Sequence, residues 1–276
     1  MSKKNQYRIY LNLEGFHPIE IGQKIGDCEF GFEQDYNVYF ISTVVSAENP
    51  KKAKSKGVLR LERILSIITL QTGVSYPVRS VHMEQISGEK PFVVTVSLDL
   101  KRITFLPLKK EKIEEIKKTI KLLDNLPSEE RSTAIIDKGI NYFLRGCFLE
   151  CEWRSESFLN FYKAIELITN EFRKEFDAEI KNQLKDTILC NITDEEVRAL
   201  RTPKRQIQFS CQQIGITPSC NISKILTLRN EFSAHARLKE VEVSSEDKND
   251  CKSLAAMMIL WYVNYVKTKK ITKLKN

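Results

Sequence analysis

The sequence of 276 residues lacks the features that mark membrane-spanning or secreted proteins. No apolar run approaches the roughly 18 residues needed to cross a bilayer. The two longest candidates, Ile64–Leu70 and Leu254–Val263, are typical of buried helix faces. The basic N-terminus has no apolar segment behind it, which argues against a secretory signal. We therefore expect a cytoplasmic protein that does not associate with a membrane.

Histidine is scarce, and the cysteines follow no metal-binding pattern. The three histidines, His17, His82 and His235, are far apart in the sequence, which almost excludes a histidine-rich metal site. None of the seven cysteines belongs to a Cys-x-x-Cys pair, and Cys147 and Cys151 have no histidine nearby. We expect free thiols in a reducing compartment, with no metal and no cofactor.

Glycine and proline are also sparse, at 10 and 8 residues, so long loop-rich regions are not expected. Hydrophobic residues make up 42% of the chain and charged residues 29%, which is the balance of a globular protein. The formal net charge of +8 fits a polyanionic partner, although many basic proteins bind no nucleic acid. The length fits one large domain or two ordinary ones.

The first hundred residues favour strands arranged around one helix. Apolar and aromatic side chains alternate with a period of two, which is typical of strands. Strands are predicted at Tyr7–Leu13, Ile19–Ile21, Cys28–Phe32, Val38–Val45 and Pro91–Ile103. In Asn49–Thr72 the apolar residues recur every three or four positions, which indicates a helix packed on a sheet. Residues 1–107 are predicted to form an α+β domain of unknown specificity that could bind a protein partner.

The composition changes after Leu108, and the pattern becomes helical throughout. Lys109–Leu123 is dense in lysine and glutamate and is interpreted as a connecting helix. Thr193 and Glu196 fit a capping box, and Pro203–Pro218 is interpreted as a polar connection. Further helices are predicted at Ser128–Leu149, Ser155–Phe176, Asp177–Leu189, Cys220–His235 and Ser245–Lys267. Residues 108–276 are therefore predicted to form an all-α bundle, which makes the whole chain α+β.

The most informative segment is Ile222–Arg237, with the sequence ISKILTLRNEFSAHAR. Because an α-helix advances about 100° per residue, Arg229 shares a face with Ile225 and borders the hydrophobic layer. An arginine placed there usually has an acidic or phosphate partner, since burying an unpaired charge is costly. His235 lies roughly 120° around the helix from Arg229. The two side chains converge only if the arginine reaches around, the helix distorts, or a second subunit completes the site.

Arg229-Asn230, followed by Ser233-Ala234-His235, resembles the Arg-x(4–6)-His motif of HEPN domains. The stretch FLNFYKAIEL at 158–167 resembles the aromatic-rich helix near the start of that domain, and the order of the helices is similar. The resemblance covers about half of the chain. It is strongest to the bacterial, Apea-like proteins in which an unrelated β-containing domain precedes the HEPN bundle.

The resemblance implies a ribonuclease that needs no metal and forms a homodimer through the bundle, with two motifs facing one cleft. Arg229 would bind the scissile phosphate of RNA, His235 would transfer protons, and Asn230 would orient the pair. Glu166 would position Arg229. The neighbouring 2′-hydroxyl would be the attacking group and would leave a cyclic phosphate. The habit of the family suggests a toxin or an anti-phage defence protein.

Other interpretations of the same residues stay open. Many HEPN-like domains keep the fold without catalysis, so Arg229 could form only a structural ion pair with Glu166. The domain would then be an interaction module or would bind a nucleotide or RNA. His235 could interact with the last carbonyls of its helix, and Asn230 could be an ordinary surface amide. A third class is an antitoxin-like regulator whose basic surface holds nucleic acid without cutting it.

Overall fold

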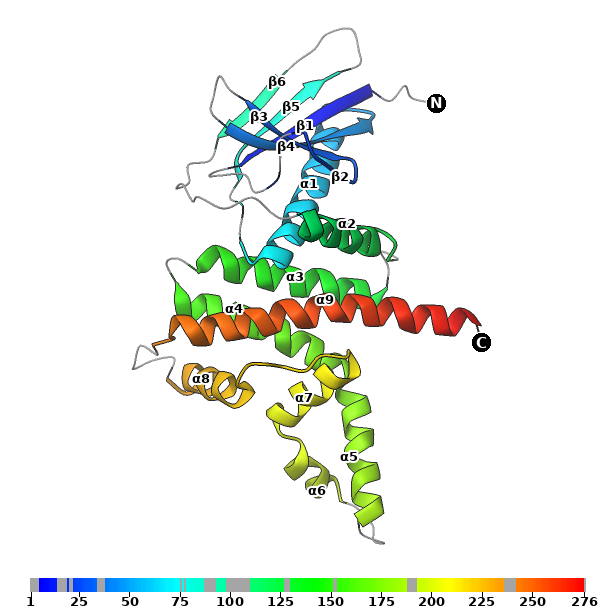
Figure 1. Ribbon diagram of the computed structural model, residues 1–276, viewed down its shortest axis with the longest axis vertical. Coiled ribbons are helices and arrows are strands. Elements are labelled where there is room, and N and C mark those ends of the chain that lie inside the picture. The colour runs from blue at the N-terminus through cyan, green and yellow to red at the C-terminus, as the bar shows by residue number, and fades with distance from the viewer. Residues whose placement is uncertain are drawn as a thin grey trace. The chain divides into compact units, whose positions relative to one another are not determined.

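The computed structural model describes residues 5–13, 19, 22–33, 38–74, 76, 78–86, 93–97, 110–126, 130–150, 153–187, 193–235 and 242–275 (Figure 1). The chain divides into two compact units, Met1–Asp124 and Asn125–Asn276. The first unit contains the sheet, and the second is built from helices, which confirms the α+β layout.

The N-terminal unit is an antiparallel sheet that carries one long helix. Its elements are β1 (Asn5–Leu13), β2 (Lys24–Ile25), β3 (Cys28–Glu33), β4 (Val38–Ala47), α1 (Pro50–Thr72), β5 (Val78–Gln85), β6 (Val93–Ser97) and α2 (Lys110–Asp124). The described strands follow the order β2-β3-β4-β1-β5-β6. In β1 the side chains of Tyr7, Ile9, Leu11 and Leu13 are buried, which confirms the predicted alternation.

Helix α1 forms where its sequence predicted. The Asn49 side chain accepts a hydrogen bond from the Lys52 N–H, and Pro50 occupies the first turn, where no N–H is needed. The helix ends at Gly73, whose φ of 72° is left-handed. Gly57 faces the side chain of Ile9, so the missing Cβ lets α1 approach β1 closely.

Helix α2 belongs to the N-terminal unit, whereas the sequence boundary at 107/108 assigned it to the helical half. Its apolar stripe is buried, and Gln71 Nε2 of α1 donates a hydrogen bond to Thr119 Oγ1 at 3.0 Å. An Arg63 nitrogen also donates to the Leu123 carbonyl at 3.1 Å. The boundary therefore lies at 124/125.

Strand β5 was not predicted. It pairs with β1 on one side and β6 on the other, but only Ser80 and Met83 are buried along it, so its sequence shows no clean alternation. β6 falls within the predicted strand Pro91–Ile103, and the rest of that range lies outside the described residues. The predicted strand Ile19–Ile21 also lies largely outside them.

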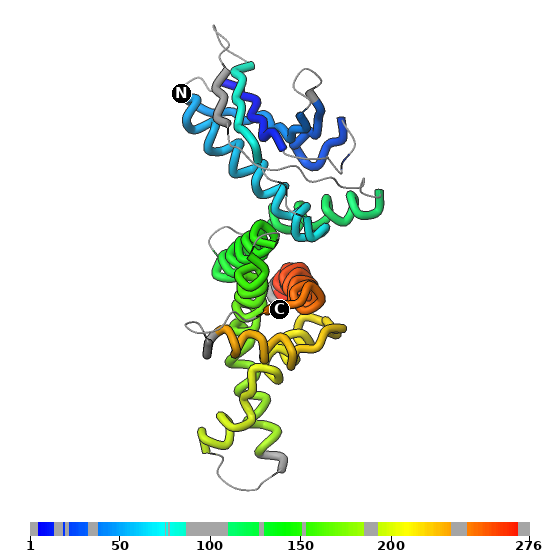
Figure 2. Tube along the Cα trace, turned by 90° about the vertical axis from the view of Figure 1, so that its left-hand side faces the viewer, coloured from blue at the N-terminus to red at the C-terminus, as the bar shows by residue number. Residues whose placement is uncertain are grey.

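The C-terminal unit is a helical bundle. Its elements are α3 (Arg131–Leu149), α4 (Arg154–Glu171), α5 (Arg173–Thr187), α6 (Asp194–Leu200), α7 (Pro203–Gln213), α8 (Ile222–His235) and α9 (Ser245–Lys275). Helices α3, α4 and α9 pack together, and the two views agree that α4 and α9 lie side by side (Figures 1 and 2). None of the described helices has an apolar stretch of the length that a bilayer span requires.

Three helix boundaries differ from the prediction. The expected break after Phe176 falls at Phe172, where α4 ends. The segment Pro203–Pro218 is not only a connection, because α7 begins there behind a Thr202 cap and is followed by Gly215 at a φ of 80°. Helix α9 continues through the basic tail to Lys275. The predicted first residue of the helix Ser128–Leu149, Ser128, lies outside the described residues.

The capping box at the start of α6 is confirmed. The Glu196 N–H donates to Thr193 Oγ1 at 3.3 Å, and the Thr193 N–H donates to Glu196 Oε2 at 2.9 Å. This short helix packs on α5 through a separate apolar cluster that includes Phe176, Ile180 and Val197. The cluster holds α5 and α6 together away from the α3–α4–α9 packing.

A largely buried ion cluster joins the end of α3 to α9. The Glu150 carboxylate accepts a bond from the Lys248 ammonium at 2.7 Å and another from Lys252 at 2.5 Å. Burial raises the pKa of Glu150, but the hydrogen bonds from the two lysines outweigh it and leave this pKa below its usual value. The carboxylate therefore stays ionised and fixes the start of α9 against α3.

Candidate functional site

Helix α8 carries the Arg-Asn-x-x-x-x-His sequence and places its arginine at the border of the core. Asn221 accepts a hydrogen bond from the Lys224 N–H at 3.2 Å and so caps the first turn. Ile225 and Leu228 are buried, while 38% of the Arg229 side chain stays exposed. The predicted position at the edge of a hydrophobic layer is confirmed.

Arg229 meets Glu166 of α4. The Arg229 Nη2 atom lies 3.6 Å from Glu166 Oε1, and both side chains are partly exposed. This separation is an ion pair but is too long for a good hydrogen bond. Arg229 Nη1 also donates to the side-chain oxygen of its neighbour Asn230 at 3.2 Å. Three of the four residues singled out in the sequence are therefore in contact.

The ring of Tyr162 completes this arrangement. The guanidinium carbon of Arg229 lies 5.6 Å from the ring centroid, within range of a cation–π interaction. Tyr162 is one helical turn before Glu166 on α4. Burial raises the pKa of the Tyr162 hydroxyl, the Glu166 carboxylate raises it further, and Arg229 opposes both. The ring is thus a neutral platform for the cation.

His235 is the last described residue of α8. The side chain of Phe232, one turn earlier, packs against Phe158 of α4 with ring centroids 5.9 Å apart, which anchors the end of the helix. The side chain of His235 lies outside the described residues. The expected convergence of Arg229 and His235 therefore stays a prediction.

A basic and aromatic strip continues from this site onto α3. The ammonium groups of Lys138 and Lys163 lie 5.9 Å and 6.0 Å from the centroid of the Tyr142 ring. Lys163 follows Tyr162 in the sequence and is one turn from Glu166 on α4. We call Lys138, Tyr142, Lys163, Glu166 and Arg229 the α3–α4–α8 strip.

Sequence reasoning missed the aromatic members of this site. The helical pattern of Ser155–Phe176 places Tyr162 among the apolar side chains, and its ring is buried, but Arg229 lies over the ring. The spacing of Lys138 and Tyr142, four residues apart on one helix, was a local signal that could have been found. The approach of Lys163 to Tyr142 depends on how α3 packs against α4, so no local pattern contains it.

Two buried cysteines of the helical unit are not poised as nucleophiles. Burial raises the pKa of the Cys147 and Cys211 thiols to about 12, so neither is a thiolate near neutral pH. Within the described ranges, no group of three or more His, Cys, Asp or Glu side chains is arranged to hold a metal ion.

Comparison with known proteins returned no match: no family model fits the chain, and no curated protein or solved structure is similar to it at a significant level.

Proposed function

We propose that the C-terminal unit is a HEPN-type domain that cleaves RNA without a metal, by attack of a 2′-hydroxyl on the adjacent phosphodiester. The observation that carries this proposal is the grouping of Arg229 with Glu166, Asn230 and Tyr162 at a partly exposed position. A planar guanidinium suits a phosphate, because it can donate two hydrogen bonds to the phosphate oxygens.

The strength of the Arg229–Glu166 pair agrees with such a role. An ion pair between partly exposed side chains is worth only about 0–1 kcal/mol. A phosphate diester can therefore compete for the guanidinium, while Glu166 and the Tyr162 ring hold it in place beforehand. This arrangement positions the cation at little cost in stability.

The α3–α4–α8 strip offers a path for the rest of the RNA strand. Proteins bind single-stranded nucleic acid through cations that follow the backbone and aromatic rings that stack on bases. Lys138 and Lys163 supply exposed cations, and Tyr142 lies between them, partly exposed. The net charge of +8 also favours the binding of a polyanion such as RNA.

His235 is proposed as the proton-transfer residue, with the second motif of a homodimer completing the cleft. Imidazole titrates close to neutral pH and can therefore accept and return a proton. Two strongly exposed aromatic side chains near the α3–α4 connection, Phe148 and Trp153, offer apolar surface that a second copy would cover. We place the protein in the cytoplasm, in a toxin or defence setting.

The test is RNA cleavage in the presence of EDTA by the wild type and by the His235→Ala variant. Loss of a general acid or base lowers the rate by about 10²-fold or more, whereas RNA binding should change little. Equal cleavage by the two proteins would remove His235 from the mechanism. Cleavage that EDTA abolishes would remove the metal-independent mechanism.

The second candidate is a HEPN-like module that binds RNA, a nucleotide or a protein partner without cutting. The contacts of Arg229 with Glu166 and Tyr162 also support this second candidate, because an arginine with a purely structural role would form the same contacts. This candidate predicts RNA binding that weakens in Lys138→Gln/Lys163→Gln, with no cleavage by the wild type at any enzyme concentration.

A further inference from the structure

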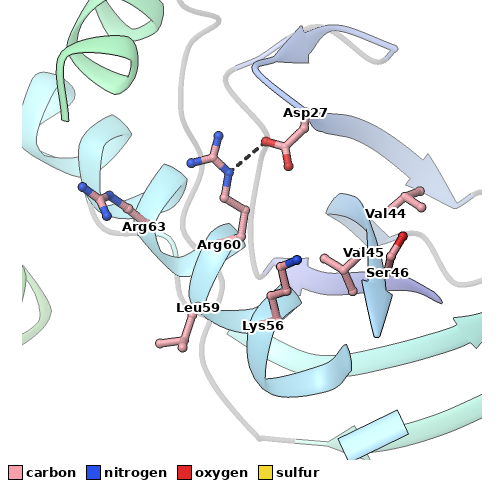
Figure 3. Close-up of a pocket in the computed structure, with 8 residues that line it drawn as sticks. All are labelled: Asp27, Val44, Val45, Ser46, Lys56, Leu59, Arg60 and Arg63. Atoms are coloured by element: carbon pink, nitrogen blue, oxygen red, sulfur yellow. Dashed lines mark hydrogen bonds and ion pairs between the residues drawn. The ribbon is translucent and has the colours of Figure 1, made fainter. Parts of the chain in front are cut away.

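A second site lies in the N-terminal unit, in a cavity of about 580 Å³ between α1 and the end of β4 (Figure 3). Its lining is Asp27, Val44, Val45, Ser46, Lys56, Leu59, Arg60 and Arg63. The volume falls within the range of about 300–1,000 Å³ that is typical of small-molecule sites. All lining residues belong to one unit of the chain.

The cavity exists because β4 is longer than its neighbour β3. The last paired positions are Cys28 and Thr43, so within the described residues β4 continues from Val44 to Ala47 without a partner on that side. On the side of β1 away from β4, the Gln6 carbonyl accepts a hydrogen bond from the Ile86 N–H. This bond sets which backbone groups of β1 point toward β4 and which point away from it. Backbone N–H and C=O groups alternate in direction along a strand. Those of Val45 therefore point toward β1, and those of Val44 and Ser46 point toward the cavity.

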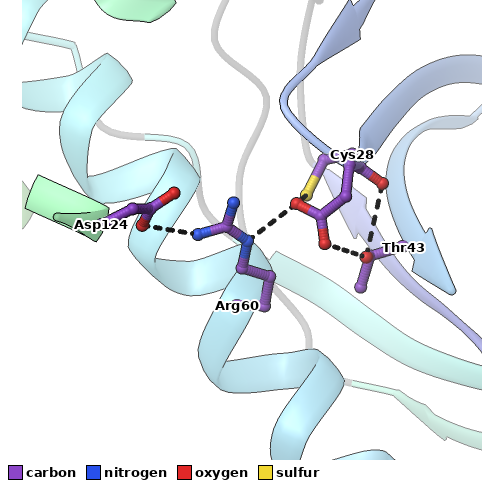
Figure 4. A network of polar contacts seen from close by, with 5 residues as sticks. Cys28, Thr43, Arg60 and Asp124 are labelled. Atoms are coloured by element: carbon purple, nitrogen blue, oxygen red, sulfur yellow. Dashed lines mark hydrogen bonds and ion pairs between the residues drawn. The ribbon is translucent and has the colours of Figure 1, made fainter. Parts of the chain in front are cut away.

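Arg60 lines the cavity, and two carboxylates hold its guanidinium in place. Its Nε donates to Asp27 Oδ1 at 2.8 Å and its Nη1 donates to Asp124 Oδ1 at 2.8 Å (Figure 4). Thr43 Oγ1 donates to the other Asp27 oxygen at 3.1 Å. The carboxylates of Asp27 and Asp124 are therefore both paired with the Arg60 guanidinium.

Two further cations on α1, Lys56 and Arg63, flank Arg60. Lys56 is one turn before Arg60 and extends toward β4, and Arg63 is one turn after it and reaches toward α2 (Figure 3). Among the residues that the structure describes, neither forms an ion pair, and the one hydrogen bond of Arg63 goes to a neutral carbonyl. The lining thus carries uncompensated positive charge.

The same lining also exposes apolar surface. The Leu59 side chain is 64% exposed and Val44 is 43% exposed. A large aliphatic side chain left open beside two cations suits a ligand that has both an apolar part and an anionic part. An inorganic ion would use the cations and leave the apolar surface uncovered.

We propose that this cavity binds a small organic phosphate of the size of a mononucleotide, with its phosphate at the basic side chains that α1 contributes to the lining and its organic part against the apolar part of the lining. The Ser46 N–H provides a further donor for the anion. This inference concerns a different unit from the proposed ribonuclease site and does not depend on it.

The experiment is calorimetric titration of the full chain with three probes: adenosine monophosphate, inorganic phosphate and adenosine. The nucleotide should bind with one site per chain. It should bind at least about tenfold more tightly than either of the other probes, because only it uses both parts of the cavity. Lys56→Gln/Arg63→Gln should weaken nucleotide binding at least about tenfold.

Three further variants separate this site from others. Lys51→Gln/Lys54→Gln removes the same charge from the same helix outside the cavity and should leave nucleotide binding within about twofold of the wild type. Leu59→Ser should weaken binding of the nucleotide but not of inorganic phosphate. Arg229→Gln should not affect nucleotide binding, whatever it does to RNA.

Each contrary result overturns the proposal. No nucleotide binding by the wild type, equal weakening by the two double variants, or equal binding of phosphate and nucleotide would each do so. Binding of an RNA oligonucleotide that depends on Lys56 and Arg63, without nucleotide binding, would make the surface a nucleic-acid contact instead. Circular dichroism spectra equal to that of the wild type establish that the variants are folded.

Discussion

Arg229 of α8 and Glu166 of α4 face each other, with 3.6 Å between the guanidinium and the carboxylate. The pair sits against the ring of Tyr162 and is open to solvent on its other side. A weak pair at this position can hold the guanidinium in place without occupying it permanently.

The role of Glu166 is testable by Glu166→Gln. The change should alter the free energy of unfolding by less than about 1 kcal/mol, because both side chains are partly exposed. If Glu166 positions Arg229, cleavage at saturating RNA should fall about tenfold, with RNA affinity retained. Glu156→Gln on the same helix is the matched control. An unchanged rate in Glu166→Gln would exclude a positioning role.

Two glycines of α3 should respond in opposite ways to alanine. A Cβ at Gly146 would overlap the ring of Phe161, whereas a Cβ at Gly139 would lie 3.5 Å from the nearest atom of Ile259. Gly146→Ala should destabilise the protein by about 1–3 kcal/mol through overpacking. Gly139→Ala should be neutral or stabilising by up to about 1 kcal/mol, because alanine favours the helix. Urea unfolding followed by tryptophan fluorescence measures both, and equal effects would contradict the packing described.

The cluster of Glu150 with Lys248 and Lys252 should contribute strongly to the free energy of unfolding of the bundle. Glu150→Gln keeps the shape but leaves two nearly buried ammonium groups without their carboxylate. We expect a loss of about 3 kcal/mol at pH 7, measured by urea unfolding. Glu115→Gln removes an exposed pair with Lys112 and should cost under about 0.5 kcal/mol. A similar small loss for both variants would show that the cluster is not effectively buried.

The Asp27–Arg60 pair predicts a pH dependence in the N-terminal unit. Burial raises the pKa of Asp27, but the hydrogen bond and charge of Arg60 outweigh it, and the pKa ends below its usual value. The stabilising contribution of Asp27 is therefore complete above its unfolded-state pKa of about 3.9 and is lost as the pH falls through the lower folded-state pKa.

Asp27→Asn should consequently lower the stability by less than about 1 kcal/mol at pH 7, since 52% of the Asp27 side chain is exposed. The difference from the wild type should shrink as the pH falls below about 4, because the wild-type carboxylate is then progressively protonated. Thermal unfolding followed by circular dichroism at several pH values measures this. A difference that is constant with pH would mean that the charge of Asp27 contributes nothing.

The sequence predicted those parts of the fold that local patterns specify. The alternation in β1, the helical spacing of Asn49–Thr72 and the Thr193–Glu196 capping box are all local patterns, and all three elements are present. Strand β5 and the assignment of α2 were not predicted, because they depend on pairing with β1 and on packing against α1. Such contacts join distant segments and leave no short-range pattern.

The candidate site divides in the same way. The motif on α8 and the suggestion of Glu166 came from the sequence, and the ion pair with Arg229 agrees with them. The Tyr162 platform, the approach of Lys163 to Tyr142 and the cavity beside Arg60 arise from the packing of separate elements. A helical pattern assigns Tyr162 to the core and cannot show that one face of its ring meets a cation.

The most direct test of the central claim is to identify the ends that the protein leaves on RNA in EDTA. Attack by the 2′-hydroxyl, with Arg229 on the phosphate, predicts 2′,3′-cyclic phosphate and 5′-hydroxyl ends. Arg229→Gln should reduce their formation by about 10²-fold or more. Products with 3′-hydroxyl ends, or equal product from Arg229→Gln, would contradict the account.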